Sequence, residues 1–150
     1  MNKDMQKLKA KYSLKKITDR INKYSEISFV KAYHAIDLDS MIKDEVQDIF
    51  RIDYPIAFKK PYNSTDLDHY FYALLDHLNY NSDSFHWFIP YYSGSDWWIE
   101  LRFDSIGKFI NCYFNDKFTD FTAIDLVNYV LFDISNTEDY VEYRVKYYYK

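Results

Sequence analysis

The sequence predicts an α+β fold in which helices pack on one face of a mostly antiparallel sheet. The chain holds only two glycines, Gly94 and Gly107, and each lies between runs of aromatic and β-branched residues. Runs in which apolar residues recur at helical spacing flank this central region on both sides. A length of 150 residues is typical of one domain, so we expect a single domain over residues 1–150.

The central region, residues 85–114, predicts a meander of three antiparallel strands. The two glycines would supply the positive φ angles that tight turns favour. In the middle strand, apolar residues alternate with Trp98, Glu100 and Arg102, which indicates one buried face. The opposite face, where we expect Trp98 beside Tyr113, is either covered by another element or binds a partner. The expected strands are residues 85–92, 97–103 and 108–114.

The N-terminal segment, about residues 2–25, predicts a helix with an apolar stripe and a basic opposite face. Residues 1–25 carry eight basic and two acidic groups, a net charge of 8 − 2 = +6. Residues 26–150 carry 11 basic and 21 acidic groups, a net charge of 11 − 21 = −10. The basic helix therefore either packs on the acidic body and partly neutralises it, or contacts nucleic acid or a partner protein.

Two further helices are predicted before the meander by apolar periodicity and capping residues. Asp39 fits the N-cap of a helix over residues 40–50. Thr65 and Asp68 resemble a capping box that opens the next helix, which ends before residue 79. The strands expected in this part of the chain are residues 27–36 and 54–58.

The segment after the meander predicts one helix and one strand. Thr122 followed by Asp125 resembles a capping box, and apolar residues at helical spacing continue to Ile134. Residues 139–149 alternate between apolar and polar side chains and predict a C-terminal strand. We expect this strand to rejoin the sheet through a right-handed crossover.

Several classes of function are excluded by the motifs that the sequence lacks. Two glycines cannot build a phosphate-binding loop or a dinucleotide fingerprint. His69 and His77 lie on one predicted helix but about 12 Å apart along its axis, too far for one metal ion. The lone Cys112 fits a small buried hydrophobic residue. We therefore expect no catalytic residue, no cofactor and no metal, and a protein that is not an enzyme.

The location of the protein is indicated by three features of the sequence. Residues 1–5 are charged and lack the apolar segment of a secretory signal. No run approaches 18 apolar residues, and a single cysteine cannot form an internal disulfide. These features predict a cytoplasmic protein without a membrane partner.

A region that is both acidic and aromatic suggests where a partner could bind. Residues 61–101 contain no lysine or arginine, but they hold six acidic residues, three tryptophans and six tyrosines. These acids either form a solvated surface that favours solubility or attract a basic partner that aromatic rings then anchor. The residues expected to bind this partner are Asp83, Trp87, Asp96, Trp98, Glu100 and Tyr113.

Two hypotheses of function follow. The first is a small acidic binding protein that inhibits a partner with a basic active surface. Such a protein would be an immunity protein (antitoxin) against a toxin or nuclease, or a phage-encoded inhibitor of a host defence nuclease, such as an anti-CRISPR. The second is a nucleic-acid-associated regulator, whose lysine-rich N-terminal helix contacts phosphates while aromatic rings stack on exposed bases.

Overall fold

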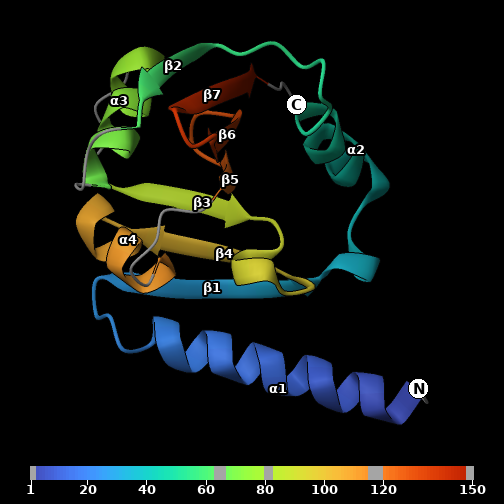
Figure 1. Ribbon diagram of the computed structural model, residues 1–150. Coiled ribbons are helices and arrows are strands. Elements are labelled where there is room, and N and C mark those ends of the chain that lie inside the picture. The colour runs from blue at the N-terminus through green and yellow to red at the C-terminus, as the bar shows by residue number, and fades with distance from the viewer. Residues whose placement is uncertain (1–2, 63–66, 80–82, 115–119, 148–150) are drawn as a thin grey trace.

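The computed structural model describes residues 3–62, 67–79, 83–114 and 120–147, and in these ranges it shows four α-helices and a seven-stranded antiparallel sheet (Figure 1). The predicted α+β class with an antiparallel sheet is confirmed. The helices are α1 (Lys3–Ile21), α2 (Ser40–Ile49), α3 (Asp68–Leu78) and α4 (Ile106–Tyr113). The strands are β1 (Ile27–His34), β2 (Phe58–Pro61), β3 (Phe85–Ile89), β4 (Trp97–Phe103), β5 (Phe121–Asp125), β6 (Val130–Asn136) and β7 (Tyr140–Tyr147). The 3₁₀ turn η1 (Ala35–Asp37) lies between β1 and α2, and the 3₁₀ turn η2 (Tyr92–Gly94) lies between β3 and β4.

The sheet has the strand order β1-β4-β3-β5-β6-β7-β2. Strands β3 and β5 are joined through the pairs Trp87–Asp125 and Phe88–Ile124. In Figure 1 the strands on the two sides of this junction run in clearly different directions. The sheet is therefore bent in the middle. Different helices cover its two faces.

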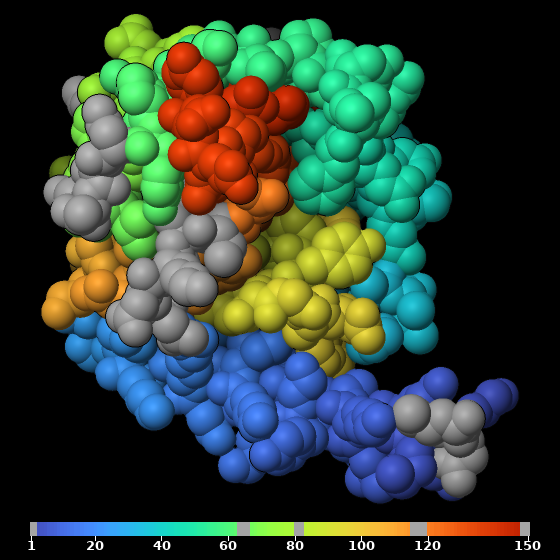
Figure 2. All heavy atoms as spheres, viewed as in Figure 1, coloured from blue at the N-terminus to red at the C-terminus, as the bar shows by residue number. Residues whose placement is uncertain are grey.

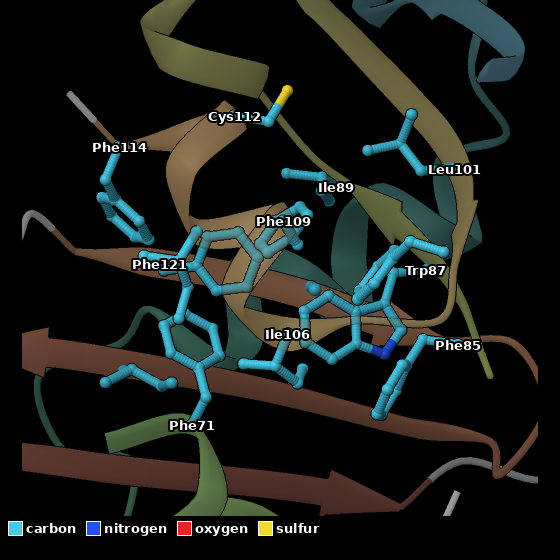
Figure 3. Packing of buried hydrophobic residues seen from close by; sticks show 14 of the residues in the cluster. Phe71, Phe85, Trp87, Ile89, Leu101, Ile106, Phe109, Cys112, Phe114 and Phe121 are labelled. Carbon is cyan, nitrogen blue, oxygen red and sulfur yellow. The ribbon is translucent and has the colours of Figure 1, made fainter. Parts of the chain in front are cut away.

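One face of the sheet forms the main core, together with α1, α3 and α4. Its centre is aromatic, and Figure 3 shows Trp87 among the side chains of the strands and of α4. The alternation predicted for β4 is confirmed, because Ile99, Leu101 and Phe103 are all buried on this face.

The opposite face carries a smaller apolar cluster, in which Val46 and Ile49 of α2 pack with Phe88 and Trp98. Successive residues of a strand point to opposite faces, so α2 lies across the sheet from the other three helices. The expectation that helices pack on one face therefore holds for α1, α3 and α4, whereas α2 covers part of the other face.

The third strand of the predicted meander is instead the helix α4. Ser105 is its N-cap, because its Oγ accepts a hydrogen bond from the Lys108 backbone N–H at 3.2 Å. Strand β4 already pairs with β1 on one side and β3 on the other, so no edge of β4 remains free for another strand. Gly107 thus lies in a helix and not in a turn. A Cβ at this position would lie 3.2 Å from Asp68 Oδ2, so a larger residue would require the Asp68 side chain to shift by a few tenths of an ångström.

The helix predicted between Thr122 and Ile134 is wrong, because this segment is the hairpin of β5 and β6. Asp125 Oδ1 accepts hydrogen bonds at 2.9 Å from the backbone N–H groups of Val127 and Asn128. It therefore closes a turn, and Tyr129 adopts a φ of +56° in this turn. The predicted C-terminal strand is present as β7, but it pairs antiparallel with its neighbour β6, so the expected crossover is wrong as well.

The helices α1, α2 and α3 and the strands β1 and β3 agree with the sequence apart from shifts at their ends, whereas β2 shares only Phe58 with the strand expected there. Asp39 caps α2, since its Oδ1 accepts a hydrogen bond from the Met41 N–H at 2.8 Å. The strand expected at residues 54–58 lies at 58–61, at one edge of the sheet. At the other edge, the register of β1 against β4 shifts between Phe29 and Lys31, which makes a β-bulge. The predicted cap at Thr65 falls outside the described residues.

Candidate functional site

The six residues expected to bind a partner do not share one surface. Trp87 and Trp98 are both 0% exposed and lie on opposite faces of the sheet, under α3 and α4 and under α2 respectively. Asp83 and Asp96 are exposed. These two rings are therefore not exposed, because helices cover both faces of the central strands. The sequence left open whether Trp98 is covered by another element or faces a partner, and the structure shows that it is buried.

Glu100 is largely buried and already has partners within the chain. One of its carboxylate oxygens lies 2.6 Å from His86 Nε2, on the neighbouring strand β3. The other accepts a hydrogen bond of 3.3 Å from the Tyr33 hydroxyl on β1. Three adjacent strands thus bring these side chains together on the face opposite the main core, and both carboxylate oxygens of Glu100 have partners within the chain.

A cleft of about 970 Å³ lies between the end of α2, the turn η2 and strands β5, β6 and β7. Its polar wall comes from the sheet face opposite the main core, where the strand register aligns Thr122 with Asp133 and Asp133 with Arg144. The polar residues of this wall are Asp120, Thr122, Asp133, Ser135, Glu142 and Arg144. Aromatic residues of the lining are Phe50, Tyr91, Tyr113 and Phe114.

Asp133 is the central polar group of the cleft and is only 5% exposed. Thr122 Oγ1 donates a hydrogen bond of 2.8 Å to its Oδ1, and Ser135 Oγ donates one of 2.6 Å to its Oδ2. Burial raises the pKa of Asp133, and the nearby carboxylate of Asp120 acts in the same direction. The two hydroxyl groups and Arg144 oppose this rise in pKa without cancelling it.

The two arginines that line the cleft are paired with carboxylates. Arg144 donates to Glu142 Oε1 at 3.3 Å, and Arg51 lies 3.6 Å from Asp48 and 3.3 Å from Asp53. Asp120 and Asp133 lie in the cleft in addition to these pairs. The cleft therefore combines an excess of acidic groups with aromatic walls, an arrangement suited to a cationic group.

Tyr113 is the one expected partner residue that lines this cleft. Its ring packs against Tyr92 and Phe121, each with a centroid distance of 4.9 Å, and burial raises its pKa. Sequence reasoning missed Asp133 and Thr122 because it placed them on a helix. The alternation from Val130 to Ser135 was the available signal, since it puts Asp133 and Ser135 on one face of a strand.

The lysines of α1 are exposed, and in the described ranges the ion pair they form is Lys15 with Asp19, inside the helix itself. The helix attaches to the body through Ile17 and Ile21, which are buried in the main core. The Trp97 indole N–H also donates a hydrogen bond of 3.0 Å to the Ala10 carbonyl. Buried apolar side chains and this hydrogen bond thus attach α1, and no ion pair joins its lysines to the acidic body within the part of the chain that the structure describes.

The same described ranges lack a metal-binding cluster and a helix able to span a membrane. There, no group of three His, Cys, Asp or Glu side chains is placed to hold a metal ion. No described helix has both the length and the apolar character needed to cross a bilayer. Comparison with protein-family models, with curated proteins and with solved structures finds no match to this chain.

Proposed function

We propose that this protein binds a basic protein partner and inhibits it by covering the partner's basic surface. The observation that carries this proposal is the acidic, aromatic-walled cleft around Asp133. A lysine or arginine side chain of the partner enters the cleft, where Asp120 and Asp133 attract its charge and the aromatic residues contact its apolar stem. The cleft volume of about 970 Å³ is in the range of known ligand clefts.

The rim of the cleft favours a protein partner over a small molecule. Ile52, which lines the cleft, is 99% exposed, and its neighbour Phe50 is also exposed. Large apolar side chains around a charged pocket give a partner protein additional surface to bury. Acidic groups at the centre would speed association with a basic surface. Because salt screens this attraction, the association should weaken as the salt concentration increases.

Both biological forms of such an inhibitor remain part of the proposal. The protein acts in the cytoplasm either as an immunity protein against a toxin or nuclease, or as a phage-encoded inhibitor of a host defence nuclease such as an anti-CRISPR. In both forms its role is binding, without a cofactor and without a catalytic step of its own.

The test is capture of a partner from the native host, followed by a measurement of that partner's activity. We expect the wild type and the Asp76→Asn variant, which alters an exposed acid outside the cleft, to retain the same basic protein. The double variant Asp120→Asn/Asp133→Asn should retain much less of it. The purified partner should lose activity when one equivalent of this protein is added. Equal capture by the cleft variant, or a captured partner that stays fully active, contradicts the proposal.

A second candidate, the nucleic-acid-associated regulator, is favoured by the exposed lysines of α1. Lys7, Lys11 and Lys15 are exposed and follow one another at intervals of four residues, so they lie along one side of the helix. This function predicts a salt-sensitive shift of nucleic acid in a gel. The shift should disappear when these three lysines become Glu and persist in the control Lys59→Glu. A wild-type protein that shifts neither DNA nor RNA at low salt rules this function out.

A further inference from the structure

Helix α1 has two apolar sides that point in opposite directions. Ile17 and Ile21 are buried against the body, whereas Leu8 and Tyr12 are each 62% exposed. At about 100° per residue, the direction of Leu8 and Tyr12 lies about 180° around the helix from that of Ile17 and Ile21. Met5 continues the exposed side by one turn. We call Met5, Leu8 and Tyr12 the outer stripe of α1.

The outer stripe is accessible and is bordered by positive charge. Figure 2 shows the N-terminal half of α1 extending past the rest of the molecule. Lys9, Lys15 and Lys16 are exposed beside the stripe, and Lys16 Nζ lies 4.7 Å from the centre of the Tyr12 ring. An apolar stripe between lysines fits a partner surface that is itself apolar and acidic.

A surface with these properties lies on the same chain, at the start of α2. Ile36 is 78% exposed and Met41 is 74% exposed. Residues 36–45 hold four acidic groups and one lysine, a net charge of 1 − 4 = −3, although Glu45 is paired with Lys146 of β7 at 2.8 Å. Met41 precedes Asp44 and Glu45 by three and four residues, so these side chains are neighbours on the helix surface. We call residues 36–45 the α2 shoulder.

The two surfaces cannot meet within one molecule. Helix α1 packs on the main-core face of the sheet and α2 packs on the other face. The outer stripe also points away from the body, because it is opposite the residues that attach α1 to it. A single copy therefore presents both halves of a complementary pair, and both stay exposed.

We propose that the outer stripe of α1 docks on the α2 shoulder of a second copy of this chain. Opposite charges align the two helices, and the exposed apolar side chains Leu8, Tyr12 and Met41 are buried between them. The contact joins two different surfaces, so it closes into a ring or continues into a chain of copies unless a two-fold arrangement satisfies both contacts at once.

This inference does not depend on the proposed inhibitory function, because it uses other residues. The cleft is lined by the opposite end of α2, from Ile49 onward. Variants of the outer stripe and the shoulder leave Asp120 and Asp133 unchanged, and the cleft variants leave the shoulder unchanged. Failure of one proposal is therefore recognised separately from failure of the other.

The test is sedimentation velocity over a wide range of protein concentrations, at low and at physiological salt. We expect the wild type to associate with rising concentration, and more strongly at low salt. Lys9→Glu/Lys16→Glu should weaken association by about tenfold or more, and Asp37→Lys/Asp44→Lys should do the same. All four side chains are exposed, so both variants should fold, which circular dichroism checks.

The decisive experiment is to mix the two charge-reversed proteins. Each has the charge that the other now needs, so an equal mixture should associate although neither protein does so alone. Leu8→Ser/Tyr12→Ser should also weaken association, and its mixture with Lys9→Glu/Lys16→Glu should stay weak, because both proteins carry an altered stripe. The control variants Lys59→Glu and Asp83→Lys, with exposed charges outside both surfaces, should behave as the wild type. A wild type that stays monomeric at every concentration overturns the proposal. So does association of either charge-reversed variant by itself at the strength of the wild type. A mixture of the two variants that remains monomeric overturns it as well. Monomers that bind nucleic acid through α1 would overturn it in favour of the second candidate function.

Discussion

Trp87 lies at the centre of the main core, and substitutions there separate the contribution of its ring from the cost of its N–H group. The residue is 0% exposed, and the ring centroids of Phe103 and Phe132 lie 4.9 and 5.2 Å from its own. Its buried Nε1 has no hydrogen-bond acceptor within the described part of the chain. In Figure 3 this nitrogen points toward Phe85, whose ring centroid is 5.6 Å away, and a ring is only a weak acceptor.

The two substitutions should therefore differ strongly in their effect on the free energy of unfolding. Trp87→Ala removes about 200 Å² of buried surface, which at about 25 cal/mol per Å² corresponds to about 5 kcal/mol. Trp87→Phe keeps most of the ring contacts and loses about 1 kcal/mol of apolar burial. It also removes an unpaired buried donor, whose desolvation costs about 1–3 kcal/mol. We expect Trp87→Phe to lie within about 1 kcal/mol of the wild type, or to be more stable.

The assay is urea unfolding followed by far-ultraviolet circular dichroism, with Trp97→Phe as the matched control. The Trp97 N–H donates to the Ala10 carbonyl at 3.0 Å, so its removal should destabilise the protein by about 1 kcal/mol or more. A loss of about 3 kcal/mol or more in Trp87→Phe would refute the reasoning, because it would mean that the indole N–H carries no net cost.

Three further predictions concern polar groups. Burial raises the pKa of Asp133 above its unfolded value of about 3.8, so its contribution to stability should fall as pH rises from that value through the raised pKa. Asp133→Asn should remove this component, and unfolding midpoints of variant and wild type that run parallel from acidic to neutral pH would contradict it. Tyr143→Phe should cost about 1–2 kcal/mol in urea unfolding, since the buried hydroxyl donates to the Tyr70 carbonyl at 2.7 Å; a loss below about 0.5 kcal/mol argues against this bond. Lys146→Met should lower the melting temperature, because Lys146 Nζ bonds Asp48 at 2.6 Å and joins β7 to α2. That difference should shrink at high salt, and a difference independent of salt would show that packing dominates.

Elements fixed by local signals could be predicted from the sequence, whereas those fixed by distant pairing could not. Asp39 identified the start of α2, and the alternation along β4 identified its buried face. The segment 106–114 fits both patterns, because Ile106 and Phe109 have helical spacing while Ile110, Cys112 and Phe114 alternate. The choice between helix and strand depends on β1, which occupies the second edge of β4 from about 70 residues earlier in the chain.

The candidate site was harder to predict for the same reason. Trp98 belongs to a strand whose second face looked open from the sequence, and only the packing of α2 shows that it is buried. Thr122 and Asp133 meet because a hairpin brings them opposite each other, 11 residues apart in sequence. No short sequence motif predicts this contact between Thr122 and Asp133. Tyr113 was singled out for its ring, and it reaches the cleft from the end of a helix that the sequence did not predict.

The two edge strands of the sheet, β1 and β2, bear on how readily this chain could form fibrils. A long, flat edge strand can template the addition of strands from other molecules, which is the first step of amyloid growth. Here the bulge between Phe29 and Lys31 interrupts the regular edge of β1, and β2 is a short strand that ends in Pro61, after the exposed Lys59. Both features oppose edge-to-edge addition. A protein with 21% aromatic residues should therefore resist conversion to cross-β aggregates as long as its native fold persists.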